Sequence, residues 1–231
     1  MIKRVKGTLD TLDMRRIDAL FNAATQHLNA AHFAHIELPI LEHEALFKHS
    51  VGQETDIVTK EMYSFTANGK EMLCLRPEGT AGTMRAFLEN KIEDRPWQVF
   101  SMGPMFRHER PQKGRYRQFT QLNVEAIGVS TVADDVRFLS VLDDFFTTTL
   151  GLHDYVLSVN YLGTSDDRAA HRTALQSFVT QHKNDVCDTC QTRISTNILR
   201  IFDCKNECCQ ALYQTAPKIT DHLSEQSAAN W

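Results

Sequence analysis

The sequence contains no apolar run long enough to cross a membrane as a helix, and its first ten residues, MIKRVKGTLD, lack the apolar core of a secretory signal. It also lacks low-complexity segments and internal repeats. Basic residues are not in excess, because 25 Lys and Arg stand against 29 Asp and Glu, giving a formal net charge of -4. Proteins that coat nucleic acid usually carry a broad basic face, so that class is not favoured.

A disulfide framework is not expected either. The chain has six cysteines, and without a secretory signal these are predicted to be reduced thiols in the cytoplasm. With 231 residues, 42% of them hydrophobic, the chain can bury one sizeable core, or one core and a small annex. These features predict a cytoplasmic, water-soluble globular protein with no membrane partner.

Hydrophobic spacing predicts a helix over residues 11–33, with Thr11 or Asp10 as its N-cap. The segment HIELPILE, residues 35–42, follows as a short strand. Because Pro39 cannot donate to a sheet ladder, this strand is expected at a sheet edge or at an interface. A hairpin is expected over residues 61–79, since Asn68-Gly69 suits the positive φ angles of a tight turn.

The remaining elements are expected to alternate strands with helices. A short helix should follow Glu78, with Ala81, Met84 and Leu88 inward. Apolar patterns predict strands over 97–106, 118–128 and 155–163, and a helix over 132–150 that ends at Gly151. No strand is expected after Gly163. The predicted fold class is therefore α+β, an antiparallel sheet flanked by helices with a helical C-terminal segment.

One loop gathers positive charge in this mildly acidic chain. Residues 107–118 hold four arginines and one lysine against a single glutamate. Arginine binds phosphate oxygens bidentately and can stabilise charge that develops during phosphoryl transfer. The alternative is a solvated hairpin tip with incidental basic residues.

The strand after this loop is expected to have a polar face and an apolar face, because side chains alternate along a strand. The apolar face comprises Thr120, Leu122, Val124 and Ala126. The other face comprises Phe119, Gln121, Asn123 and Glu125. An aromatic ring can stack on a base, and a carboxylate can accept from an ammonium or imidazole N–H.

The cysteines of the last third are spaced as zinc ligands often are. A CxxC pair is followed by a second cysteine group, and the predicted ligand set is Cys187, Cys190, Cys204 and Cys208. The alternative is a set of reduced thiols on a helical annex, and the adjacent Cys208-Cys209 pair departs from a regular second zinc knuckle. Both interpretations remain open from the spacing.

The segment FRHERPQKGRYRQFTQLNVEAIG, residues 106–128, resembles the second signature motif of class II aminoacyl-tRNA synthetases, in the form found in histidyl-tRNA synthetases. Further blocks resemble that family and occur in its order: KGTLD, ELPILE, LFKHSVGQETDIVTKEMYSF, LRPEGTAG and TNILRIFDCKN.

The resemblance implies a reaction and a set of site residues. Histidine and ATP, with Mg²⁺ accompanying the ATP, would form histidyl-adenylate and pyrophosphate, and the histidine tRNA would then be acylated. Arg107 matches the catalytic arginine that clamps the α-phosphate and the amino-acid carboxylate. Glu109, Arg115 and Phe119 match ATP-binding positions. The positions that match histidine-binding residues are Glu78, Thr80, Gln121 and Glu125.

The resemblance also implies an assembly and a boundary. The first helix and the Pro39 strand resemble the family's first motif, which forms a homodimer interface. Residues 1–163 are expected to be an incomplete catalytic core, and residues 164–231 the possible start of an insertion. No segment of this sequence resembles the family's third motif, its histidine-specific segment or its anticodon-binding domain. We therefore expect impaired activity from this chain alone.

Two other classes of function stay open. One is a synthetase-like regulatory subunit of ATP phosphoribosyltransferase, a paralogue that keeps the fold without the full catalytic set. The presence of Arg107, Glu109, Gln121 and Glu125 argues against it. The other is a non-catalytic interaction fragment that retains only the dimer surface.

Overall fold

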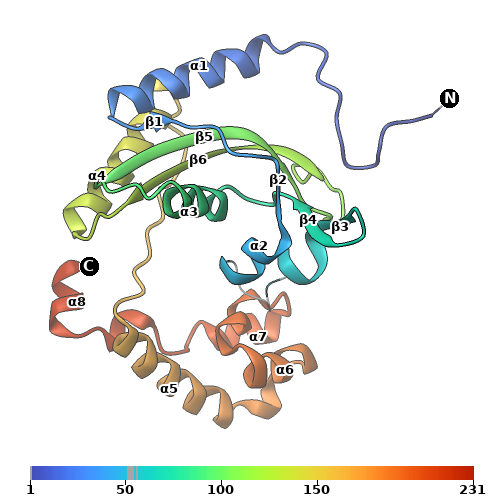
Figure 1. The fold of residues 1–231 in the computed structure, drawn as a ribbon. Helices are drawn as coiled ribbons and strands as arrows, with labels where there is room; N and C mark the ends of the chain where they lie inside the picture. Colours follow the sequence, from blue (N-terminus) through green and yellow to red (C-terminus); the bar gives the residue numbers. More distant parts are fainter. Residues whose placement is uncertain (1, 51–54, 56) are drawn as a thin grey trace. The chain divides into compact units, whose positions relative to one another are not determined.

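The computed structural model describes residues 2–50, 55 and 57–231. Part of the block 46–65, at positions 51–54 and 56, lies outside the described residues. The chain divides into two units, Met1–Tyr155 and Val156–Trp231. Both units are drawn in Figure 1.

The first unit is built on two three-stranded sheets. One has the order β1-β5-β6 and the other β2-β4-β3. The strands are β1 (Ala34–His35), β2 (Leu41–His43), β3 (Tyr63–Ala67), β4 (Glu71–Leu75), β5 (Trp97–Phe106) and β6 (Gln118–Ile127). All strand pairs are antiparallel except β1 with β5. The predicted antiparallel α+β class is confirmed.

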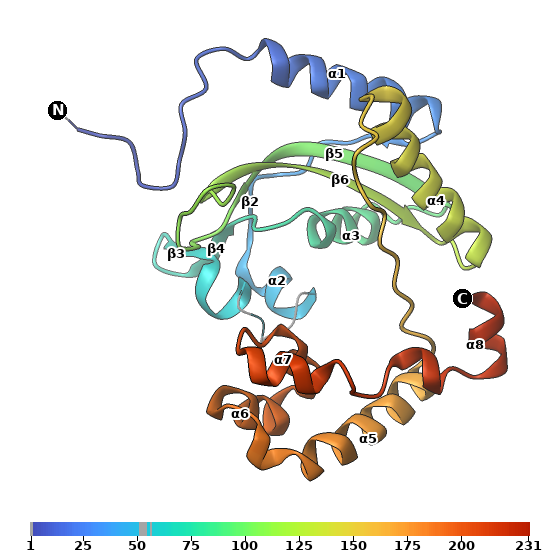
Figure 2. The same cartoon turned by 180° about the vertical axis from the view of Figure 1, so that it is seen from behind.

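Helices cover both faces of the long β5–β6 hairpin. The helices of the first unit are α1 (Arg15–Ala30), α2 (Glu44–Ser50), α3 (Thr80–Glu89) and α4 (Val132–Asp144), with π-helical turns at Ile57–Glu61 and Phe145–Thr149. Of these, α2 packs on α3, β2 and β4. In both views α1 and α3 lie on opposite sides of this hairpin (Figures 1 and 2). The core on the α1 side joins Leu28, Phe33 and Phe100 to Leu122 and Val124, so the predicted apolar face of β6 is confirmed.

Two predicted details of the helices are wrong. The first helix begins at Arg15 after Met14, so neither Thr11 nor Asp10 caps it; the Asp13 carboxylate accepts from the Arg15 backbone N–H instead. On α3 the buried side includes Ala81 and Phe87, whereas Met84 and Leu88 are exposed. The register of a short helix depends on its starting residue, and the Glu78 carboxylate fixes that start by accepting from the Thr80 and Ala81 backbone N–H groups.

Two predicted strands also differ from the structure. Residues 35–42 split into β1 and β2, which lie at the edges of different sheets, and Pro39 stands between them outside any ladder. The predicted strand 155–163 has no strand assignment, because none of the described residues pairs with it. By contrast, the hairpin turn at Asn68-Gly69 has positive φ at both residues, as predicted.

The second unit is helical, and no strand occurs among its residues, all of which the structure describes. Its helices are α5 (Ser165–Gln181), α6 (Asp188–Thr196), α7 (Glu207–Tyr213) and α8 (Glu225–Asn230), with 3-10 turns at Lys183–Asp185, Ile198–Asp203 and Ile219–His222. The core is a cluster around Leu175, Val179 and Ile201 that also contains three cysteines. None of the helices in the described parts of the chain is long and apolar enough to span a bilayer.

Candidate active site

Arg107 stands where β5 ends and the cationic loop begins. The last strand residue, Phe106, pairs with Gln118 of β6, and the Arg107 backbone N–H donates to the Arg117 carbonyl at 3.0 Å. The Arg107 Nε donates to the Pro77 carbonyl at 2.9 Å. Its guanidinium carbon lies 5.2 Å from the centroid of the Phe119 ring, within range of a cation–π interaction. One donor and one face are thus used to orient the group, and the two terminal nitrogens can serve a ligand.

The loop after Arg107 is held by segments distant in sequence. The His108 backbone N–H donates to the Glu61 carbonyl at 2.7 Å, and the Arg117 N–H donates to the Gly7 carbonyl at 2.7 Å. Gly7 has a φ of +92°, and a Cβ there would meet the Arg117 side chain. The N-terminal KGTLD block therefore packs against the cationic loop, and together they line a cavity of about 720 Å³ that includes Arg115.

Arg115 and Glu109 form an ion pair across this loop. The Arg115 Nη1 lies 3.4 Å from the Glu109 Oε2. Arg115 is exposed, whereas the Glu109 carboxylate is largely covered, and its Oε2 lacks a hydrogen-bond partner among the described residues. This pair brings a cation and a carboxylate acceptor to the side of the hairpin where the loop leaves β5.

The polar face of β6 also holds unsatisfied groups. Gln121 lies opposite Gly103, and Asn123 opposite Ser101. The Asn123 Nδ2 donates to the Glu125 Oε1 at 3.2 Å. Within the described residues, the buried Gln121 Oε1 and Ser101 Oγ have no hydrogen-bond partner. Buried polar atoms without partners are costly, so a polar ligand that paired with these atoms would be favoured.

The N-terminus of α3 lies against this polar face. A Cβ on Gly79 would stand 2.9 Å from the Asn123 Cγ, so only glycine permits this approach. The Glu78 carboxylate accepts from the backbone N–H groups of Thr80 and Ala81 at 2.6 and 2.9 Å. Glu78 thus stabilises the start of α3, and each of its oxygens retains a further lone pair for a ligand. Thr80 begins the helix and is exposed.

Arg76 is a buried structural residue whose contribution the sequence did not reveal. It is 5% exposed and donates to the carbonyls of Leu38 at 2.7 Å and Pro104 at 3.0 Å. Burial lowers the pKa of this guanidinium from its ordinary value. It ties the break between β1 and β2 to the end of β5, close to Arg107. No spacing rule distinguishes it from the loop arginines.

The second unit carries the predicted cysteine group, with one change. The Sγ atoms of Cys187, Cys190, Cys204 and Cys209 all lie within 4.8 Å of one another. Cys208, a predicted ligand, is exposed and outside this group, and its neighbour Cys209 takes that place. Asn206 caps α7, and this start of the helix turns Cys209 rather than Cys208 toward the core.

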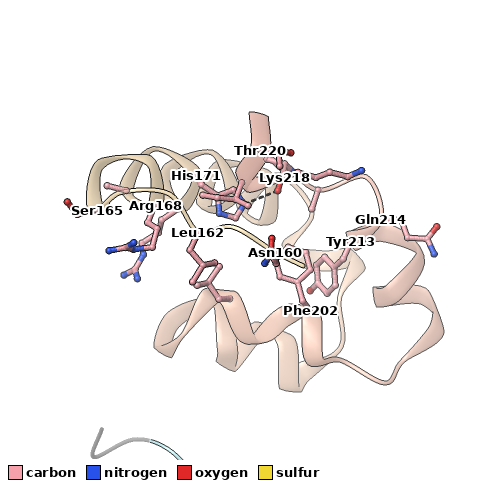
Figure 3. Close-up of a pocket in the computed structure, with 16 residues that line it drawn as sticks. Asn160, Leu162, Ser165, Arg168, His171, Phe202, Tyr213, Gln214, Lys218 and Thr220 are labelled. Atoms are coloured by element: carbon pink, nitrogen blue, oxygen red, sulfur yellow. Dashed lines mark hydrogen bonds between the residues drawn. The ribbon is translucent and has the colours of Figure 1, made fainter. Parts of the chain in front are cut away.

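A cavity of about 890 Å³ also lies in the second unit (Figure 3). Its lining includes Arg168, Arg172, Phe202, Tyr213 and Lys218. None of the residues predicted to bind histidine or ATP lines this cavity.

Comparison with known proteins decides the family. A family profile described as histidyl-tRNA synthetase matches residues 8–213. The chain belongs to the histidyl-tRNA synthetase family. It is 44% identical over 228 residues to the histidine–tRNA ligase of Sulfurimonas denitrificans, covering 96% of this chain and 56% of that protein. It is 41% identical to that of Aquifex aeolicus, covering 97% and 57%. The chain thus spans a little over half the length of these curated relatives.

Solved structures agree with the family assignment. The apo histidyl-tRNA synthetase of S. aureus matches with a TM-score of 0.77 and 30% identity, over 100% of this chain and 53% of that one. A Bacillus halodurans structure titled ATP phosphoribosyltransferase regulatory subunit/histidyl-tRNA synthetase matches with a TM-score of 0.63. At 18% identity, covering 100% of this chain and 66% of that one, it shows the shared fold alone.

Proposed function

We propose that this protein is a histidine–tRNA ligase, and that the first unit supplies part of its activation site. The observation that carries the proposal is the position of Arg107, at the end of a strand whose partner bears Phe119, Gln121 and Glu125 on one face. In the reaction, a histidine carboxylate oxygen forms a bond to the α-phosphorus of ATP, and the bond to pyrophosphate breaks. A ribose hydroxyl of the tRNA then attacks the activated carbonyl, and AMP leaves.

Arg107 would lower the barrier to the first step. Two anions, the carboxylate and the α-phosphate, must approach each other, and a guanidinium that donates to both offsets their repulsion. The hydrogen bond from Arg107 Nε to Pro77 and the contact with Phe119 support this role, because they fix the group before the substrates arrive.

Three neighbouring residues would bind ATP. Phe119 would stack on the adenine ring, and Glu109 would accept from the adenine amino group. The Glu109 Oε2 atom that has no hydrogen-bond partner is available for such a donor. Arg115 would close over the phosphates. Mg²⁺ would enter with ATP, mainly on phosphate oxygens and water, so we assign it no protein ligands.

The polar face would bind histidine. Gln121, Glu78 and Thr80 would accept from the α-ammonium, and the Gln121 Oε1 atom needs a donor of this kind. Glu125, held by Asn123, would accept from the imidazole N–H. A polar contact of this type rejects a side chain that lacks the donor far better than a hydrophobic pocket does.

Partners, a cellular compartment and domain boundaries are proposed together with this activity. The histidine tRNA and a second copy of the chain are the expected partners, and the cytoplasm is the expected compartment. Residues 1–163 would form part of the catalytic core and residues 164–231 the start of an insertion. Because relatives are nearly twice as long, we expect no adenylate synthesis from the 231 residues alone.

The test is ATP–pyrophosphate exchange with each amino acid supplied in turn. It would use this chain alone and a chimera in which the chain replaces the matching 228 residues of the Sulfurimonas denitrificans relative. We expect exchange from the chimera with histidine only. In the chimera, Arg107→Ala should lower kcat/KM by roughly 1,000-fold and Glu125→Gln by at least about 100-fold.

The outcomes separate the parts of the proposal. A folded chimera that activates no amino acid, or activates one other than histidine, would overturn the function. Exchange by the 231-residue chain alone, with histidine only, would confirm histidine as substrate and refute the claim that the remaining half of the relatives is needed.

A further inference from the structure

Four cysteines converge in the core of the second unit from three short helical elements. Cys187 precedes α6 and Cys190 lies in its first turn; Cys204 follows the turn Ile198–Asp203; Cys209 lies in the first turn of α7. Cys190, Cys204 and Cys209 are buried, and Cys187 is partly exposed. Segments separated along the chain thus direct their sulfurs to one point.

The distances between these sulfurs suit a metal and not a disulfide. A tetrahedral zinc site with Zn–S bonds of about 2.3 Å places its sulfurs about 3.8 Å apart. The Cys187 and Cys204 Sγ atoms lie 3.7 Å apart, and all four lie within 4.8 Å of one another. A disulfide needs about 2.05 Å, and all six cysteines are free thiols. Shifts of about an ångström or less would complete the tetrahedron.

Backbone donors point at two of the sulfurs. The Cys187 N–H donates to the Cys209 Sγ at 3.3 Å, and the Asn206 N–H donates to the Cys204 Sγ at 3.4 Å. Buried thiols that act only as small apolar groups need neither convergence of four sulfurs nor backbone donors. Thiolates bound to a metal carry negative charge, which such donors stabilise.

We propose that Cys187, Cys190, Cys204 and Cys209 bind one Zn²⁺ ion in a structural site. On binding, the four thiols each lose a proton to solvent, and the site gains a net charge of about -2 from four thiolates and one divalent cation. Thiolate ligands select zinc over Mg²⁺ or Ca²⁺. Four protein ligands leave no open coordination position, so the ion stabilises the fold and performs no chemistry. The inference does not depend on the proposed ligase activity.

The ion would act as a cross-link in a unit with a small core. Three of its ligands belong to the same buried cluster as Leu175, Val179 and Ile201. It would join α6 and α7 to the turn Ile198–Asp203 between them. Phe202 of this turn and Tyr213 at the end of α7 form part of the wall of the 890 Å³ cavity. Loss of zinc should therefore loosen both this core and this wall.

The test is metal content of the 231-residue chain, purified under reducing conditions and measured by mass spectrometry of the elements. We expect about one zinc ion per chain. Cys190→Ser and Cys209→Ser should each lower this content at least about tenfold, whereas Cys208→Ser should retain it. Cys208 is the matched control because it adjoins Cys209 and is exposed.

A second measurement does not depend on variants that could unfold. The wild-type chain, stripped of metal and loaded with Co²⁺, should show the intense thiolate–cobalt absorption of a tetrahedral sulfur site. Absence of bound metal and of this absorption in a chain that is folded by circular dichroism would overturn the proposal. Loss of zinc from Cys208→Ser with retention in Cys209→Ser would overturn the ligand set.

Discussion

At the scale of single residues, the position of the buried Arg76 side chain requires a residue without a Cβ at position 103. Gly103 lies in β5 opposite Gln121, and a Cβ there would overlap the Arg76 Nη2. Arg76 is buried and donates to three carbonyl groups, those of Leu38, Pro39 and Pro104. A side chain at position 103 would therefore displace a buried charge from its hydrogen bonds, beside the polar face that carries Gln121.

We predict that Gly103→Ala destabilises the first unit by about 2 kcal/mol or more. Urea denaturation would be followed by Trp97 fluorescence in a Trp231→Phe background, since the chain has only these two tryptophans. The control is Gly82→Ala in α3, where a Cβ would make an ordinary contact with Leu38 at 3.4 Å. Equal urea midpoints for Gly103→Ala and the parent would show that Arg76 can move at no cost.

The sequence predicted which residues form each face of β6 better than it predicted the residues that hold the neighbouring segments in place. Alternation along a strand is a local property, so the faces with Leu122 and Gln121 could be assigned from spacing. Arg76 could not be assigned, because its partners lie up to 38 residues away and are backbone carbonyls that carry no sequence signal. The choice between Cys208 and Cys209 depended on where α7 begins, which Asn206 fixes.

At the scale of elements, hydrophobic periodicity predicted most helices and strands. The wrong predictions concern segments whose structure depends on pairing with a neighbouring strand. Residues 35–42 were expected as one strand, but the chain passes between two sheets at Pro39. Arg76 donates hydrogen bonds to the carbonyls of Leu38 and Pro39, which have no strand partner in the described parts of the chain. Residues 155–163 have the apolar alternation of a strand but no ladder among the described residues. A strand is stabilised by its neighbour, so its own pattern cannot establish it.

The N-terminus of α5 is fixed by one buried carboxylate. Asp167 is 4% exposed and accepts from the Thr164 hydroxyl at 2.8 Å and from the backbone N–H groups of Thr164 and Ser224, both at 2.7 Å. Together with a hydrogen bond from the Ser227 hydroxyl, which has the largest effect, these bonds lower the pKa of Asp167 below its ordinary value. The carboxylate joins the start of α5 to the start of α8.

This arrangement predicts acid sensitivity of the second unit. Because the folded-state pKa of Asp167 is depressed, its stabilisation is fully present above about pH 4, the unfolded value, and is lost as the pH falls toward the folded value. Asp167→Asn should lower the melting temperature at pH 7, and its difference from the parent should shrink below about pH 4.

The measurement is thermal unfolding followed by Trp231 fluorescence in a Trp97→Phe background, because Trp231 stacks on Tyr161 in the same unit. Asp166→Asn is the control, since Asp166 is an exposed carboxylate in the same turn. A difference between Asp167→Asn and the parent that stays constant down to pH 2 would contradict the assignment.

At the scale of the whole molecule, the first helix leaves apolar surface uncovered. On α1 only Ala24 and Leu28 are buried, whereas Leu20 is 43% exposed. Ile40 and Leu41, in the segment around Pro39, are exposed as well. These two segments are the ones whose resemblance to the first class motif predicts a homodimer interface, and a second copy of the chain would remove such surface from water.

We therefore predict a dimer, with a mass in solution about twice the 26.3 kDa of one chain. Light scattering after size-exclusion chromatography, over a range of concentrations, would measure it. Leu20→Glu should weaken association at least about tenfold, because it places a charge in an apolar contact. Leu88→Glu is the matched control, since Leu88 is 67% exposed on α3, outside the predicted interface. A monomeric parent chain, or equal weakening by both variants, would refute this interface, and the exposed apolar residues of α1 would then need another partner.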